Sequence, residues 1–233
     1  MLPLKDDVPS RSFPLFTVLL IAANVAAFLY QASLEMAPGG STRGTAAAFV
    51  MEFGAVPCRI TGFCPNDEFP APYVTVFTSM FLHGGLLHLA GNMLYLWIFG
   101  DNVEDTLGHF RFLGFYLLSG LGAAAAQTLV HPESRVPMIG ASGAISGVLG
   151  AYLLLFPHAR VLTLITFGFF IRFVHIPAVI VLGFWIVVQV VFGLVSVGAG
   201  AEEGGVAWFA HVGGFVAGLV LLFLFRPRGT ARL

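Results

Sequence analysis

A serine in a run of small residues is the first group in this sequence that could do covalent chemistry. Ser142 lies in the stretch Gly-Ala-Ser-Gly-Ala-Ile-Ser-Gly, residues 140–147. A serine hydroxyl is a weak nucleophile until a base takes its proton, and histidine is the usual base. The alternative is structural, because a serine can cap a helix and glycines let helices pack closely. A histidine that reaches Ser142 would favour the chemical interpretation.

His211 stands among small residues near the C-terminus. In a helix, Ala207, Gly214 and Gly218 would lie within about 60° of His211. Small residues let two backbones approach, so this face would bring His211 close to the helix that packs on it. If that helix begins at Ser142, the imidazole can take the hydroxyl proton. Otherwise, His211 is a hydrogen-bonded packing residue.

A third polar group comes from the sequence His83-Gly-Gly-Leu-Leu-His88-Leu-Ala-Gly-Asn92. His88 and Asn92 are four residues apart and share a helix face. Both side chains can donate hydrogen bonds, as the stabilisation of an oxyanion requires. A metal site is the alternative, but His83 and His88 do not have the i, i+4 spacing of a preformed metal pair. We therefore expect no metal and no cofactor.

The composition indicates where these groups must lie. Of the 233 residues, 58% are hydrophobic and 10% are charged, whereas soluble domains carry about 25% charged residues. Too little polar surface remains to cover a soluble globule, so we predict a multi-pass protein embedded in lipid. The formal net charge of −1 gives no reason to expect a nucleic-acid partner.

Six apolar stretches approach the roughly 20 residues that a helix needs to cross a bilayer. They are residues 14–32, 86–104, 110–130, 142–157, 176–195 and 206–225. The sequence thus predicts an all-α bundle of six transmembrane helices in a single domain, 1–233. A long external loop, 33–82, joins the first two helices, and segments 1–12 and 226–233 are expected in the cytoplasm.

The orientation follows from the basic residues, which favour the cytoplasmic side. Those on the same side as the N-terminus are Lys5, Arg11, Arg111, Arg160, Arg172, Arg226, Arg228 and Arg232. Only Arg43, Arg59 and Arg135 fall on the other side. We expect both termini in the cytoplasm and the protein in the inner membrane. Cys58 and Cys64 then lie in the external loop, where a disulfide can form; two free thiols or a metal site are the alternatives.

The fourth stretch is short. About 15 residues from Ser142 to Phe156 make a helix of about 22 Å, less than the roughly 30 Å hydrocarbon core. If this helix ends at the cytoplasmic face, Ser142 begins it below the external surface. Irregular backbone at that depth is tolerated only against protein or a water-filled cavity.

These polar groups resemble, in order and spacing, the motifs of the rhomboid family of intramembrane serine proteases, bacterial type. The matching pieces are His83-x4-His88-x3-Asn92, Gly140-Ala141-Ser142-Gly143 and Ala210-His211-x2-Gly214-x3-Gly218. The resemblance implies a dyad in which Ser142 is the nucleophile and His211 the base. It implies that His88, Asn92 and the backbone at Ala141 and Ser142 hold the oxyanion, with His83, Gly140, Gly143, Gly214 and Gly218 in support.

The resemblance further implies single-span membrane proteins as substrates and an active site that opens to the external side. It implies that the fifth helix and the loop 196–205 move to admit substrate, and that Glu104 ties helices together. Ser146 departs from the family pattern, which has an aromatic residue four positions after the nucleophile. A catalytically inactive relative that binds membrane clients is one alternative and a transporter is another. The oligomeric state is left open.

Overall fold

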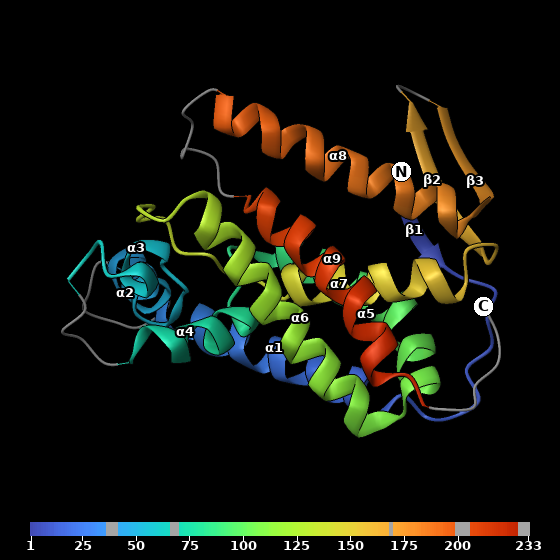
Figure 1. Ribbon diagram of the computed structural model, residues 1–233, viewed down its shortest axis with the longest axis horizontal. Coiled ribbons are helices and arrows are strands. Elements are labelled where there is room, and N and C mark those ends of the chain that lie inside the picture. Colours follow the sequence, from blue (N-terminus) through green and yellow to red (C-terminus); the bar gives the residue numbers. More distant parts are fainter. Residues whose placement is uncertain (36–41, 66–69, 168–169, 199–205, 228–233) are drawn as a thin grey trace.

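Each of the six predicted stretches is helical in the computed structural model, which describes residues 1–35, 42–65, 70–167, 170–198 and 206–227. The helices are α1 (Leu15–Glu35), α5 (Leu86–Leu107), α6 (His109–Val130), α7 (Ser142–Leu155), α8 (Ala178–Gly198) and α9 (Trp208–Phe225) (Figure 1).

Within the described residues, α1, α6, α8 and α9 are each long and apolar enough to cross a bilayer. The helix α5 qualifies together with the short helical segment before it, and α7 is shorter than a full span. The chain is therefore a multi-pass membrane protein. The total of six spans stays a prediction.

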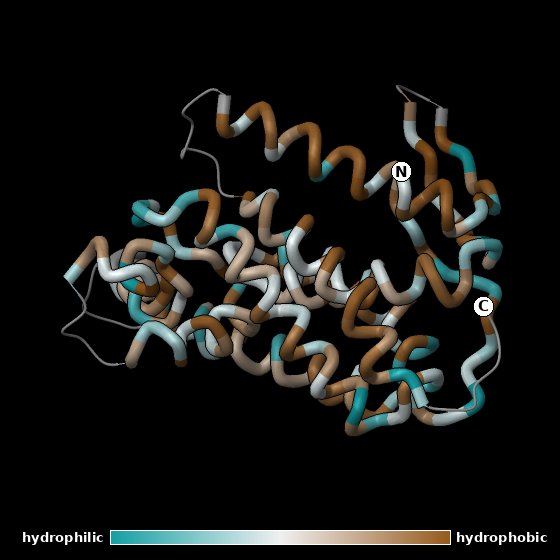
Figure 2. The backbone as a smooth tube through the Cα atoms, in the orientation of Figure 1, coloured by the Kyte–Doolittle hydropathy of each residue, from teal (hydrophilic) through white to brown (hydrophobic). Residues whose placement is uncertain are grey.

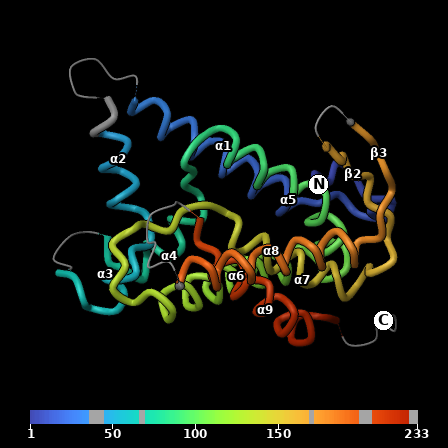
Figure 3. The backbone as a smooth tube through the Cα atoms, turned by 90° about the horizontal axis from the view of Figure 1, so that it is seen from above, coloured from blue at the N-terminus to red at the C-terminus, as the bar shows by residue number. Residues whose placement is uncertain are grey.

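The short helix α7 lies inside the bundle. Every residue from Ala144 to Tyr152 is buried, and α7 contacts α5, α6 and α9. A helix enclosed by protein on all sides must be apolar or small on all sides, which explains its lack of a polar face. In two views, α7 runs beside α6, α8 and α9 (Figure 1, Figure 3). The tube of α8 is hydrophobic over most of its length (Figure 2).

The predicted external loop carries helices of its own. These are α2 (Thr42–Phe53), α3 (Pro57–Thr61) and α4 (Pro72–Thr78), followed by a 3-10 turn at Ser79–Phe81. The segment Pro72–Phe81, which comprises α4 and this turn, meets α5 at a bend of 84°. Backbone hydrogen bonds between Ala55 and Met138, 2.8 and 3.1 Å long, fasten this segment to the connection between α6 and α7.

Cys58 and Cys64 form a disulfide within this segment. The Cys58 N–H donates to the Ser134 carbonyl at 3.0 Å, and the Thr61 hydroxyl donates to the Pro132 carbonyl at 2.7 Å. The disulfide therefore braces the part of the loop that packs against the α6–α7 connection.

A small sheet, which the sequence analysis did not predict, lies beside the helices. Among the described residues, β1 (Leu2–Lys5), β2 (Arg160–Phe167) and β3 (Phe170–Pro177) pair antiparallel in the order β1-β2-β3. The β2–β3 stretch is rich in β-branched and aromatic residues, which favour strands. Short apolar runs of this kind cannot be told from buried helix by periodicity alone.

The start of α1 is fixed by one carboxylate. Glu104 of α5 is fully buried and accepts the N–H groups of Phe16 at 2.9 Å and Thr17 at 2.8 Å. These amides belong to the first turn of α1, where no helical carbonyl can accept them, and negative charge is favourable there. The His109 ring lies 2.6 Å from the same carboxylate. The predicted role of Glu104 as a tie between helices is confirmed.

Candidate active site

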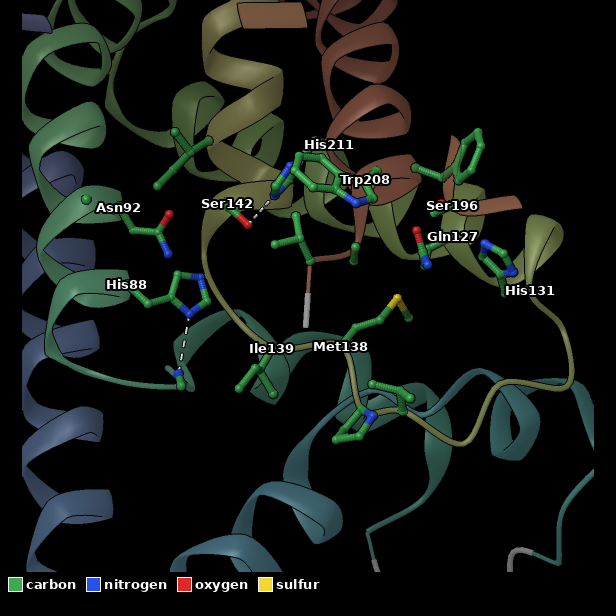
Figure 4. Close-up of a pocket in the computed structure, with 18 of the residues that line it drawn as sticks. His88, Asn92, Gln127, His131, Met138, Ile139, Ser142, Ser196, Trp208 and His211 are labelled. Carbon is green, nitrogen blue, oxygen red and sulfur yellow. Dashed lines mark hydrogen bonds between the residues drawn. The ribbon is translucent and has the colours of Figure 1, made fainter. Parts of the chain in front are cut away.

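Ser142 and His211 are in hydrogen-bond contact, 69 residues apart in the chain. The hydroxyl oxygen of Ser142 lies 2.8 Å from Nε2 of His211 (Figure 4). Ser142 is the first residue of α7 and His211 lies in the first turn of α9. The structure thus brings together the two groups that the sequence paired, at a distance that permits proton transfer.

Close packing of α7 on α9 makes this contact possible. A Cβ at Gly214 would come within 2.0 Å of the Gly143 carbonyl oxygen, and one at Gly218 within 2.1 Å of the Gly147 carbonyl oxygen. No side chain fits at either place. The glycine stripe on the His211 face therefore lies directly against the backbone of the helix that begins at Ser142.

The other ring nitrogen of His211 is held by a residue that the sequence analysis missed. Nδ1 lies 2.7 Å from Oε1 of Gln189 on α8. Since an amide oxygen only accepts, Nδ1 carries the proton and donates it to Gln189. The neutral ring then presents the lone pair of Nε2 to the Ser142 hydroxyl. A single amide within the very apolar stretch 176–195 was the signal that could have found Gln189.

Two indole rings contact the His211 ring. The centroid of Trp185 on α8 lies 5.8 Å away, and that of Trp208 on α9 lies 6.5 Å away, edge to face. Ser146 takes no part in this enclosure, because its hydroxyl donates to the Ser142 carbonyl at 2.6 Å. The aromatic contact that the family pattern places at position 146 is made here by Trp185 of α8 and Trp208 of α9.

The side chains of His88 and Asn92 extend from α5 toward the chain that leads into Ser142 (Figure 4). The Gly84 N–H donates to Nδ1 of His88 at 3.3 Å, so the neutral ring carries its proton on Nε2. Nδ2 of Asn92 is buried and has no hydrogen-bond partner in the part of the chain that the structure describes. Both groups therefore have N–H donors to offer beside Ser142.

Gly140 adjoins both donors. Its φ of +114° lies in the region that favours glycine. A Cβ there would also stand 2.8 Å from Nε2 of His88 and 3.5 Å from Nδ2 of Asn92. Glycine is therefore required at position 140 for conformation and for space.

The remaining predicted site residues lie behind this first layer. His83 is fully buried, and its ring packs edge to face on His88 with centroids 5.1 Å apart. Gln31 of α1 holds the His83 backbone by a 2.8 Å bond to its carbonyl. Ala141 is fully buried before Ser142, and the Gly143 carbonyl contacts Gly214. Cys58 and Cys64 lie in the loop, away from the dyad. Residues 199–205 of the predicted moving loop lie outside the described residues.

The dyad opens into a large cavity. Its volume is about 870 Å³, and its lining includes His88, Asn92, Ser142 and His211 together with the 136–139 segment. Most other lining side chains are apolar or aromatic, among them Tyr95, Trp185 and Trp208. A cavity with a few convergent polar groups in an apolar wall is typical of a binding site for an organic substrate.

Comparison with known proteins connects this geometry to a family. The family model described as "Rhomboid domain" matches residues 70–228. "Rhomboid protease GluP" of Bacillus subtilis is 31% identical over 205 residues, which cover 88% of this chain and 34% of the relative. "Rhomboid protein 1, mitochondrial" of Saccharomyces cerevisiae is 31% identical over 160 residues, 66% of this chain and 42% of the relative. The chain spans less than half the length of the curated relatives it matches.

Proposed function

Because the chain belongs to the rhomboid family, we propose that it is a serine endopeptidase that cleaves membrane proteins in or next to their transmembrane segments. The single observation that carries the proposal is the 2.8 Å contact between the Ser142 hydroxyl and Nε2 of His211. It occurs at the wall of a cavity where N–H donors of α5 also converge.

In the proposed reaction, Nε2 of His211 takes the hydroxyl proton while the oxygen of Ser142 attacks the scissile carbonyl carbon. The carbonyl oxygen becomes an oxyanion. The imidazolium then protonates the leaving amine, and the peptide bond breaks to give an ester on Ser142. Water attacks the ester with His211 again as base, and the acid product leaves as the hydroxyl is restored.

The oxyanion would be stabilised by donors already in place. Ser142 is the first residue of α7, so its backbone N–H has no helical acceptor. Nε2 of His88 and Nδ2 of Asn92 would supply two further N–H groups from α5. Donors that are fixed before charge develops need no reorganisation during the reaction, which makes them effective.

The proposed substrate is a single-span membrane protein, which would be cleaved near the external end of its transmembrane helix. Both termini of the enzyme would lie in the cytoplasm, so that the active site opens to the external side. The basic residues support this orientation. A helical substrate hides its carbonyls in backbone hydrogen bonds. It must therefore unwind locally before Ser142 can reach a carbonyl carbon. The cavity above the dyad has room for an extended segment.

The test compares cleavage of a model single-span substrate in detergent by wild type, Ser142→Ala and His211→Ala. We expect both variants to stay folded and to lose cleavage, and His211→Ala to lose labelling of Ser142 by a fluorophosphonate probe. Ser119→Ala is the matched control, because the Ser119 hydroxyl on α6 is buried without a partner in the described structure. Equal cleavage by Ser142→Ala would end the nucleophile assignment. A wild type that binds substrate without cleaving it would favour an inactive relative.

A further inference from the structure

A polar side chain in the most apolar helix needs a physical explanation. The best 18-residue window of α8 has a mean hydropathy of 2.7, the highest of the candidate spans among the described residues. Yet this helix carries Gln189, which is only 6% exposed. Burying an amide in apolar surroundings is unfavourable unless it is hydrogen-bonded. The partner of its oxygen is Nδ1 of His211, 2.7 Å away.

This hydrogen bond selects one of the two neutral forms of the imidazole. With its proton on Nδ1, His211 has a free lone pair on Nε2, the atom that faces Ser142 at 2.8 Å. In the other tautomer, Nε2 carries the proton and cannot accept one from the serine. An acceptor at Nδ1 therefore decides whether the base is usable, as the third member of a catalytic triad does.

The same helix also fixes the plane of the ring. Trp185 lies one turn before Gln189, and its indole centroid is 5.8 Å from His211 and 6.3 Å from Phe215. Within α9, the Trp208 ring also meets His211, edge to face, with the centroids 6.5 Å apart. Gln189 is not among the residues that line the cavity. Its amide is therefore directed at the base and not at the space where substrate would bind.

We propose that Gln189 is a positioning residue that keeps His211 in its proton-accepting tautomer. The residue of α8 thus completes a hydrogen-bonded chain from Ser142 through His211 to Gln189. The inference rests on the proposed protease function and deepens it. It makes the dyad depend on three helices, because the nucleophile, the base and the acceptor lie on α7, α9 and α8.

The experiment uses the full chain with Gln189→Leu, Gln189→Glu and, as control, Val191→Leu on the exposed side of α8, where Val191 is 50% exposed. Leucine keeps the volume but removes the acceptor. We expect fluorophosphonate labelling of Ser142 and kcat to fall about 3- to 10-fold, which is the effect of losing one neutral hydrogen bond. KM should not change, because Gln189 does not line the cavity.

Gln189→Glu distinguishes positioning of His211 from a merely structural role, because only positioning predicts a shift in the pH profile of Ser142 labelling. The carboxylate accepts the same N–H and also attracts the imidazolium. Labelling should survive, and the acid side of its pH profile should move to higher pH. A ¹⁵N spectrum of labelled histidine, assigned with His211→Ala, should show the proton of His211 on Nδ1 in wild type and not in Gln189→Leu.

Two results would overturn the inference while leaving the protease intact. One is wild-type labelling and cleavage by Gln189→Leu. The other is an equal loss in Gln189→Leu and Gln189→Glu without a shift of the pH profile, because the loss would then not depend on an acceptor at Nδ1 of His211. Thermal unfolding of each variant in detergent separates these outcomes from misfolding. A wild type that neither labels nor cleaves contradicts the proposed function itself, and the inference with it.

Discussion

An imidazole activates a serine only when its unprotonated nitrogen faces the hydroxyl. In this protein the acceptor at the far nitrogen of His211 is a neutral amide, where many serine hydrolases place a carboxylate. A neutral acceptor fixes the tautomer without adding a charge to an apolar bundle, where an isolated carboxylate would be costly. The opposite side of the site follows the same logic, since neutral His88 and Asn92 offer donors without introducing charge.

Asn92 provides a test of the oxyanion site at the level of one side chain. Its Nδ2 is buried and unpaired in the described structure, so we expect its donor to be used when the oxyanion forms. Asn92→Ala should lower kcat by about 10²- to 10³-fold and leave KM within a small factor. Steady-state cleavage of the model substrate measures both constants.

The matched control for this prediction is Asn24→Ala. Asn24 is also buried, but its amide donates at 2.7 Å to the Leu20 carbonyl of its own helix. It should leave kcat unchanged. If Asn92→Ala turns over substrate at the wild-type rate, Asn92 is not an oxyanion donor.

At the scale of elements, the site depends on how closely α9 lies on α7. Two glycines of α9, Gly214 and Gly218, contact carbonyl oxygens of α7. Ser142 and His211 lie at the end of this contact where Gly214 meets Gly143. Membrane helices gain little from hydrophobic contact with each other, so close van der Waals packing carries their association. A methyl group in this seam would separate the two helices that hold the hydroxyl and the imidazole.

Gly218→Ala tests this packing. Its methyl group would stand 2.1 Å from the Gly147 carbonyl oxygen, so α9 must shift. Overpacking of this kind costs about 1–3 kcal/mol of stability, and we expect a lower unfolding temperature with a loss of Ser142 labelling of at least about 10-fold. Differential scanning fluorimetry and probe labelling measure the two effects.

Gly183→Ala is the control for the same substitution in an apolar helix. Nothing lies within 4 Å of a Cβ at Gly183, so it should match wild type in both measurements. Unchanged stability and labelling in Gly218→Ala would show that the contact between α7 and α9 has room for a methyl group at position 218.

At the scale of the whole molecule, the N-terminal segment links the sheet to the helical bundle. β1 pairs with β2, and the next residue, Asp6, reaches into the bundle. Its carboxylate accepts hydrogen bonds from the Tyr152 hydroxyl of α7 and, at 3.0 Å, from the Asn102 amide of α5. Burial, with Asp101 and Asp7 nearby, raises the pKa of Asp6 from 3.8 to about 6.

This pKa predicts how stability depends on pH. A carboxyl whose pKa is higher in the folded state binds its proton more tightly there. Its contribution to the free energy of unfolding is fully present below pH 3.8 and is lost as the pH rises through about 6. The unfolding temperature in detergent should therefore be higher at pH 5 than at pH 7.5.

Asp6→Asn isolates this contribution, because asparagine keeps an acceptor oxygen and does not titrate. The difference in unfolding temperature between pH 5 and pH 7.5 should shrink in the variant. The same pH dependence in both proteins would assign the effect to other groups.

Much of the architecture could be predicted from sequence, because spans and glycine stripes depend on residues close together in the chain. The six helical stretches and the shortness of the fourth belong to this class. The tie at Glu104 joins residues 87 and 88 positions apart and was expected only from the family resemblance. The sheet does not belong to this class either. The stretch 160–177 is apolar enough for helix or strand, and β1 becomes a strand only because β2 lies beside it. Gln189 and Trp185 likewise stand 22 and 26 residues before His211 in the sequence, with no local pattern that joins them.

By itself, the sequence determined that this chain lies in a membrane and carries a serine and a histidine on helices able to meet. These properties follow from composition, length and 3.6-residue periodicity. Only the tertiary structure decided which nitrogen of His211 faces the serine, because that choice depends on an acceptor supplied by a third helix. Proton acceptance is a property of an atom in its surroundings, and those surroundings exist only when α7, α8 and α9 are packed together.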